Sequence, residues 1–187
     1  LCIVDTRTGS IVAKLRAGFL GRVVISSSGH LVALGSPQGD IEVWDVERKK
    51  RMLSTSAWGP GETRGLDATM MMDRGIADFS FSADERKLAV ACKECFRVLD
   101  LPSGRLGFGL TNHSSWGEMP ARGVRFLPSG ETLLVSGTSG EFGARDPDGA
   151  WLALLDLGAR RRLEQLDAKA WSVAPSPDGR RLALIRS

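Results

Sequence analysis

The chain has 187 residues, 42% of them hydrophobic and 25% charged, an apolar content that is ample for the core of a soluble globular domain. Its 25 lysines and arginines exceed its 22 aspartates and glutamates by three, and so small a net charge gives no indication of a nucleic-acid or membrane partner. No apolar run approaches the roughly 18 residues of a membrane-spanning helix, which argues against such a span in this chain.

The predicted elements begin with an apolar strand that ends in Asp5 and continue with a unit of four strands. In that unit we expect strands at 22–26, 31–36, 40–45 and 51–54, separated by turns that carry Gly and Ser. The second of these strands is apolar on both faces. That pattern is typical of a strand that is covered by a neighbouring sheet on each side.

The same pattern recurs along the chain: a small turn, an apolar strand, and a second apolar strand that ends in Asp. Where its spacings are shortest they add up to about 40 residues, the period of a four-stranded propeller blade. Longer spacings indicate insertions near 57–75, 111–121 and 137–149. The turns are centred on Gly29, Glu85, Gly130 and Gly179, and the closing strands end at Asp5, Asp45, Asp100 and Asp156.

The repeat predicts an all-β fold, a β-propeller of four-stranded antiparallel blades with about four blades' worth of chain. The stretch Leu157–Leu166 could also form a short helix, but in the repeat register it is a turn followed by a fourth strand. We predict two strands of a first blade at 1–21, complete blades at 22–75, 76–121 and 122–169, and two strands of a last blade at 170–187.

An open arc of blades would expose its edges and the apolar sides of its end blades, so we expect this segment to belong to a larger ring of six to eight blades. The alternative is that the two half-blades join and close a four-bladed ring. The chain begins at Leu1 rather than Met and shows no signal peptide, which favours a piece of a longer protein.

Two segments resemble the WD40 repeat family. Gly39–Val46 looks like its G-x-I-x-V-W-D strand, and Ser176–Ala183 looks like its S-P-D-G-x-x-L-A hairpin. The resemblance covers almost the whole chain and implies a propeller. The family's Gly-His before the first strand is absent in every unit, so its Ser–His–Asp–Trp hydrogen-bonded tetrad is incomplete, although Ser36, Asp40 and Trp44 stand at three of its positions. TolB-like and peptidase-associated propellers, which share the S-P-D-G turn, are the second choice.

The three insertions lie on one face of the propeller if the WD40 resemblance holds. Long loops on a rigid scaffold usually carry binding function, and Trp and Arg are frequent anchors for a protein partner. The alternative is that the aromatic side chains pack onto their own blade. The predicted partner-binding residues are Trp58, Arg64, Trp116, Glu118, Phe142 and Arg145.

No motif indicates an active site. Cys92 and Cys95 form a CxxC, but zinc needs four ligands and no second pair exists, so we interpret them as two thiols beside a tight turn. The segment 146–149 stops short of a calcium-binding series. Neither His30 nor His113 has a nucleophile motif nearby. We therefore predict no enzyme activity, no cofactor and no metal.

The basic side chains outnumber the acidic ones in the turns of the opposite face, but they are spread over several blades. A nucleic-acid site would need a denser field with interleaved aromatics. Cysteine is scarce and odd in number, which argues against a secreted disulfide framework and favours the cytoplasm.

The sequence thus predicts a non-catalytic protein-interaction scaffold. We expect a protein partner and no nucleic acid, membrane or small-molecule substrate. The alternatives are a propeller accessory domain of a larger enzyme, such as a hydrolase or kinase, and a TolB-like propeller of the periplasm. A fold alone does not decide among them.

Overall fold

The computed structural model describes residues 1–16, 18, 21–58, 75–92, 95–111, 121–138, 150–159, 161–166, 172–176 and 178–185. These residues form sixteen β-strands and no helix. Within that described part, no helix of the length and apolarity needed to cross a membrane occurs. The prediction of an all-β fold is confirmed.

Three four-stranded antiparallel sheets follow one another along the chain, with a two-stranded sheet before them and another after them. The first pair is β1 (Cys2–Val4) and β2 (Ile11–Lys14). The first complete sheet contains β3 (Arg22–Ile25), β4 (Leu31–Gly35), β5 (Asp40–Asp45) and β6 (Lys50–Ser56).

The second complete sheet contains β7 (Ile76–Phe81), β8 (Lys87–Cys92), β9 (Cys95–Asp100) and β10 (Arg105–Thr111). The third contains β11 (Ala121–Phe126), β12 (Thr132–Thr138), β13 (Ala150–Asp156) and β14 (Arg161–Leu166). The last pair is β15 (Ser172–Pro175) and β16 (Leu182–Ile185).

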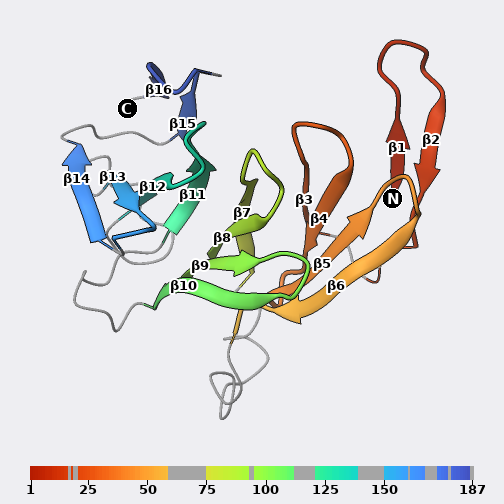
Figure 1. Ribbon diagram of the computed structural model, residues 1–187, viewed down its shortest axis with the longest axis horizontal. Helices are drawn as coiled ribbons and strands as arrows, with labels where there is room; N and C mark the ends of the chain where they lie inside the picture. The colour runs from red at the N-terminus through yellow and green to blue at the C-terminus, as the bar shows by residue number, and fades with distance from the viewer. Residues whose placement is uncertain are drawn as a thin grey trace.

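Each sheet is a simple meander in which every strand pairs with the next one in the chain. The sheets follow one another around an arc, with the first strands β3, β7 and β11 on its concave side and the fourth strands β6, β10 and β14 on its outer side (Figure 1). This is the arrangement of propeller blades. The helix considered for Leu157–Leu166 is absent, because Arg161–Leu166 is β14, the fourth strand of its sheet.

The second strand of each complete sheet is the most buried because it contributes to two cores. In β8, Leu88 and Val90 belong to a cluster shared with the sheet β3–β6. The alternate residues Ala89 and Ala91 belong to a cluster shared with β11–β14. Successive side chains of a strand point to opposite faces, so an unbroken apolar run fills both interfaces, as the sequence predicts.

The sheet β3–β6 repeats this arrangement on its other side. Val32 and Leu34 of β4 pack with Ala13 and Leu15 from the β1–β2 end of the chain, in a third core cluster.

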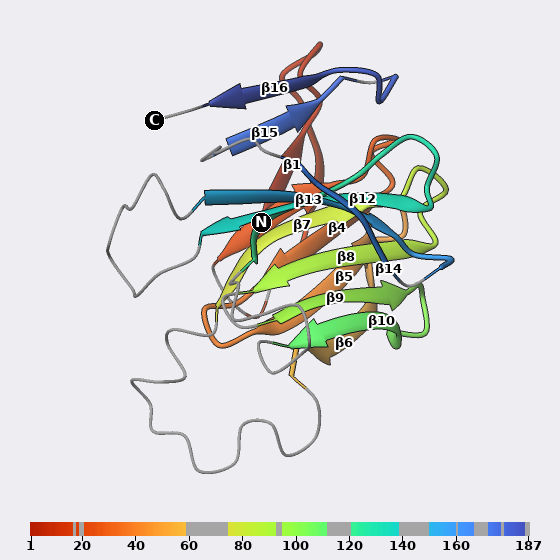
Figure 2. The ribbon, with the colours of Figure 1, turned by 90° about the vertical axis from the view of Figure 1, so that its left-hand side faces the viewer.

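The two half-sheets are separate two-stranded sheets, and the hydrogen-bonding pattern of the described residues does not join them. Figure 2 shows the β15–β16 pair beyond β12 and β13. The arc is therefore not closed into the four-bladed ring considered above.

The turns between first and second strands are built alike. A serine hydroxyl accepts a hydrogen bond from the amide five residues later, at 2.9–3.0 Å, in the pairs Ser26–Leu31, Ser82–Lys87 and Ser176–Arg181. The turn residue has a positive φ at all four predicted centres, Gly29, Glu85, Gly130 and Gly179. Glycine adopts this conformation without steric cost, so the spacing of the turns reflects a backbone requirement.

Three of the turns between third and fourth strands have a left-handed residue four positions after the strand-end Asp. It is Gly9 after Asp5 and Gly104 after Asp100, but Lys49, with a φ of 52°, after Asp45. A side chain in this conformation costs about 1 kcal/mol relative to glycine.

We expect Lys49→Gly to raise the free energy of unfolding by about 0.5–1 kcal/mol, because glycine removes the strain of this turn. Chemical denaturation measures the change. The neighbouring variant Lys50→Gly is the control, since it places glycine inside β6 and should lower stability by a similar amount. A loss of stability in Lys49→Gly would contradict the assignment of strain to this residue.

Candidate functional site

The strand ends that flank the three predicted insertions lie at one end of the sheets. Within the third sheet, Ala121 pairs with Gly137 and Thr138 pairs with Ala150. The chain therefore enters β11 beside the point where it leaves β12. Ser56, the last residue of β6, likewise pairs with the first residue of β5. The register agrees with insertions that emerge from one edge of the blades.

The structure describes one of the six predicted partner-binding residues. Trp58 is buried in the core cluster between the sheets β3–β6 and β7–β10, and its amide donates a hydrogen bond of 3.1 Å to Ser56 Oγ. Trp58 thus lies where the alternative of packing on its own blade would put it, and its partner-binding role stays a prediction. The other five lie outside the described residues: Arg64, Trp116, Glu118, Phe142 and Arg145.

The WD40-type tetrad positions are used differently in this chain. The hydroxyl of Ser36 donates to Asp40 Oδ2 at 3.1 Å inside the turn between β4 and β5. Trp44 does not join them, because its indole Nε1 donates to Glu42 Oε2 at 3.0 Å. Arg51 Nη1 donates to the other oxygen of Glu42 at 2.5 Å. Nothing in the sequence indicated that Glu42 would accept the hydrogen bond from Trp44.

Glu42 is an almost fully buried carboxylate with a complete set of donors. Burial acts to raise its pKa, but the hydrogen bonds from Trp44 and Arg51, with a long one from the Gly18 amide, outweigh burial, so that its pKa is lowered from 4.5. A depressed carboxyl pKa stabilises the fold above the unfolded-state value, and this stabilisation is lost as the pH falls through the folded-state value.

We expect Glu42→Gln to lower the free energy of unfolding by about 1–3 kcal/mol at neutral pH, because it weakens hydrogen bonds to a charged group. The wild-type protein should lose stability as the pH falls below 4.5, and the variant should lose less over that range. Denaturation titrations at several pH values test this. Parallel pH profiles of the two proteins would show that Glu42 does not supply the dependence.

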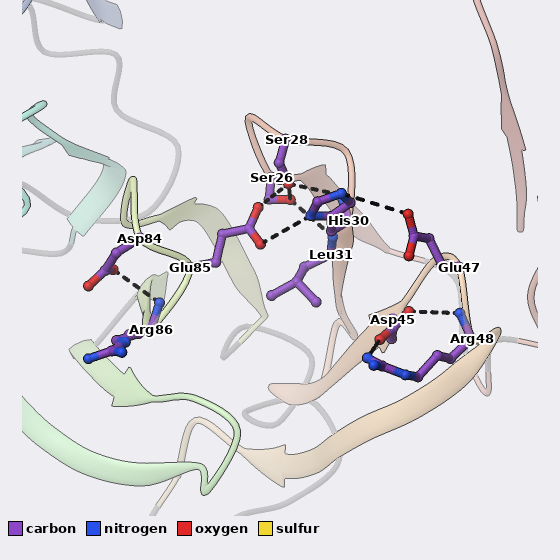
Figure 3. A network of polar contacts seen from close by, with 10 residues as sticks. All are labelled: Ser26, Ser28, His30, Leu31, Asp45, Glu47, Arg48, Asp84, Glu85 and Arg86. Atoms are coloured by element: carbon purple, nitrogen blue, oxygen red, sulfur yellow. Dashed lines mark hydrogen bonds and ion pairs between the residues drawn. The ribbon is translucent and has the colours of Figure 1, made fainter.

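A polar network joins two blades at the opposite, turn-bearing end (Figure 3). The hydroxyl of Ser28, in the turn after β3, donates to a carboxylate oxygen of Glu85, in the turn after β7. His30 lies between two acids, with Nε2 3.8 Å from Glu47 Oε1 and Nδ1 4.0 Å from Glu85 Oε2. His30 and Glu47 are exposed, so the contact between them contributes little to stability.

A second polar contact ties three blades together through Asp78, a buried residue of β7. Its Oδ1 accepts a hydrogen bond of 3.1 Å from Arg22 of β3. Its Oδ2 accepts from the guanidinium of Arg125 and, at 3.1 Å, from the amide of Val124 in β11. One carboxylate thus bridges the first strands of three successive sheets. The sequence showed charged residues inside the expected first strands, but it did not indicate which of these residues pair.

No group of three or more His, Cys, Asp and Glu side chains suited to a metal ion occurs among the described residues. Cys92 is fully buried and disulfide-bonded, so its interpretation as a thiol is wrong. The CxxC spacing alone could not distinguish free thiols from a disulfide, because a hairpin that places two cysteines on neighbouring strands is compatible with either.

No family model matches the chain, and no curated protein matches it either. Among solved structures, the chain is similar to hydrazine synthase from Kuenenia stuttgartiensis, with a TM-score of 0.69 over 97% of this chain and 16% sequence identity. The chain spans 47% of the length of that protein. At this identity the likeness shows the fold alone, and it agrees with the blade-like, all-β propeller architecture, while WD40 membership stays a prediction.

Proposed function

We propose that the chain is a non-catalytic scaffold, part of a larger WD40-like ring, that presents the loops of one face to a protein partner. The observation that carries the proposal is the set of contacts that hold the blades together. Each complete sheet has a buried second strand, and Asp78 links three first strands. A frame of this kind holds the loops between its strands at fixed spacing, which lowers the entropy lost when they bind.

The register of the third sheet also supports this proposal. It brings the flanks of the insertions near 111–121 and 137–149 together at one edge of β11 and β12. Residues from both insertions can therefore contribute to one contact area. Trp116 and Arg145 are our preferred anchors, because these residue types dominate the energetics of protein interfaces.

The test is affinity capture with the full-length protein, comparing wild type with Trp116→Ala and Arg145→Ala. We expect each variant to lose at least about tenfold in recovery of the partners that the wild type retains, the effect of an interface anchor. The matched control is Arg86→Ala, an exposed residue of the opposite turns. Undiminished recovery with both loop variants, together with loss in Arg86→Ala, would assign binding to the other face.

A propeller accessory domain of a larger enzyme is the second candidate. The similar solved structure carries the name of an enzyme and is about twice as long as the matched segment. The sequence of the whole gene product discriminates, because a catalytic segment beside this chain would support the accessory role and further blades alone would support the scaffold.

We propose the cytoplasm as the compartment because cysteine is scarce in the chain. The Cys92 disulfide is the observation that favours the TolB-like periplasmic alternative, since disulfides persist mainly in oxidising compartments. Alkylation of the protein inside intact cells tests this. Modification of Cys92 after denaturation would support the cytoplasm, and protection that reductant removes would support the periplasm.

A further inference from the structure

We propose that a second copy of this chain completes the ring, with the half-sheet β1–β2 of each copy joined to the half-sheet β15–β16 of the other. The two half-sheets lie at opposite ends of the arc (Figure 1). Each copy has three complete sheets and the two joints add two more, so the closed dimer has 3 + 3 + 2 = 8 blades, within the range of propellers. The inference rests on that part of the proposed function which places the chain in a larger ring, and it names what completes the ring.

The half-sheets supply complementary halves of one blade. The turn between β1 and β2 follows Asp5 and has Gly9 at positive φ, like a turn between third and fourth strands. The turn between β15 and β16 has the Ser176–Arg181 hydrogen bond and Gly179 of a turn between first and second strands. Among the described residues, β1 and β16 each pair with a strand on one side only. Joining β16 to β1 of the second copy therefore gives the strand order of the complete sheets.

The register of this joint follows from the complete sheets. The same rule sets Arg181, just before β16, opposite Asp5, just after β1, in the second copy. It also sets Leu184 opposite Cys2. Opposite charges directly across two strands favour pairing. The rule is that the residue two positions after the left-handed turn residue pairs with the strand-end Asp, as in Leu31–Asp45, Lys87–Asp100 and Thr132–Asp156.

The free backbone groups of the two edges are in phase. Along an edge of an antiparallel pair, successive residues point their N–H and C=O groups alternately toward and away from the partner strand. β16 bonds to β15 through the carbonyl of Arg181, so Leu184, three residues on, directs its groups to the outer edge. β1 bonds to β2 through the carbonyl of Leu1, so Cys2 directs its groups outward. The register above sets these outward groups opposite one another.

The second copy would also cover apolar side chains at the ends of the arc. Val23, Phe79 and Val124 hold equivalent positions in β3, β7 and β11, yet Val23 is 50% exposed and the other two are 1% exposed. Phe79 and Val124 lie in the cores shared with the preceding complete sheet, whereas Val23 would face β15–β16 of the second copy. There Ile185, 65% exposed, takes the place that Gly35 holds against the ring of Phe79. A large residue thus meets a smaller one in both interfaces. In the separate protomer Val23 stays exposed, so its truncation affects association rather than protomer stability.

Analytical ultracentrifugation of the protein tests the proposal, which predicts a dimer. Leu184→Pro removes an outward amide and keeps the β15–β16 pairing, because proline is tolerated at a strand edge. We expect it to raise the dissociation constant of the dimer at least about tenfold. Ser54→Pro is the matched control on the exposed outer strand β6. The amide of Ala57 donates to Gly39, so alternation turns the Ser54 amide away from β5, and this variant should leave association unchanged.

Cysteine cross-linking tests the register without a proline variant. Cys2 is an exposed free thiol, and the Cα atoms of directly opposed residues lie within the range of a disulfide. Mild oxidation should therefore link Leu184→Cys into a species of twice the mass on a non-reducing gel. Leu182→Cys is the control, because it lies two residues away on the same edge, and it should give no more of this species than the wild type.

A monomer, an open polymer, or equal weakening by Leu184→Pro and Ser54→Pro would overturn the closed dimer. So would equal cross-linking of Leu184→Cys and Leu182→Cys. A monomeric whole gene product would mean that strands of the same polypeptide cover β1 and β16. These results would leave the scaffold role standing, because capture of partners by the loop variants tests that role separately.

Discussion

Replacement of Asp78 by Asn is expected to lower the free energy of unfolding by about 2–4 kcal/mol. Both oxygens of the buried carboxylate accept hydrogen bonds from donors on neighbouring blades, namely Arg22, Arg125 and the amide of Val124. An Asn side chain offers one acceptor and places an amide donor among these donors. Removal of one partner of a buried ion pair costs about 3–5 kcal/mol, and the partial exposure of both arginines reduces that cost.

Urea denaturation of the wild type and the variant measures the change. Asp100→Asn is the matched control, because that carboxylate pairs with the exposed Arg105 within one sheet and should cost less than about 1 kcal/mol. Equal losses in the two variants would mean that Asp78 is not a special link between blades. A double-mutant cycle with Arg22→Gln would then apportion the coupling between β3 and β7.

Replacement of Phe79 by Ala is expected to lower the free energy of unfolding by about 3–5 kcal/mol, the range for deleting a buried aromatic ring. Phe79 of β7 is 1% exposed and lies in the cluster between the first two complete sheets. The opposing strand approaches closely, since a Cβ on Gly35 would stand 2.8 Å from the ring. Two rigid sheets flank the ring, so the cavity left behind cannot collapse.

The same denaturation assay tests this prediction, with Val23→Ala as the control. Val23 lies on β3 and is 50% exposed, so its truncation should change stability by less than about 0.5 kcal/mol. Hydrogen exchange adds a further criterion. Phe79→Ala should speed exchange in β4 and β5 as well as in β8, because the ring packs across the interface. A loss confined to the second sheet would argue against a shared core.

The sequence predicted those parts of the fold that are determined locally. The apolar run 31–35 indicated a strand covered on both faces, and β4 is buried along its whole length. The turn at Gly29 was evident because a left-handed backbone favours glycine. The register of β14 followed from Asp156, which closes the preceding strand and accepts a hydrogen bond from the amide of Ala159 in the turn.

The candidate sites were less predictable, because they depend on distant pairings. Asp78 and Arg125 are 47 residues apart in the chain, and only the packing of two sheets brings them together. The indole of Trp44 donates to Glu42, a carboxylate that is buried only once the sheet is packed. Trp58 offered two interpretations in the sequence, and its place in the core came from the neighbouring sheet.

The sharing of each second strand between two cores has a consequence for how such a chain can grow by gene duplication. In β8, Leu88 and Val90 complement the preceding sheet, and Ala89 and Ala91 complement the following one. A tandem copy of such a unit would carry both faces at once, so each added unit creates two interfaces that must fit. Replacement of one unit by a foreign one would mismatch two interfaces together.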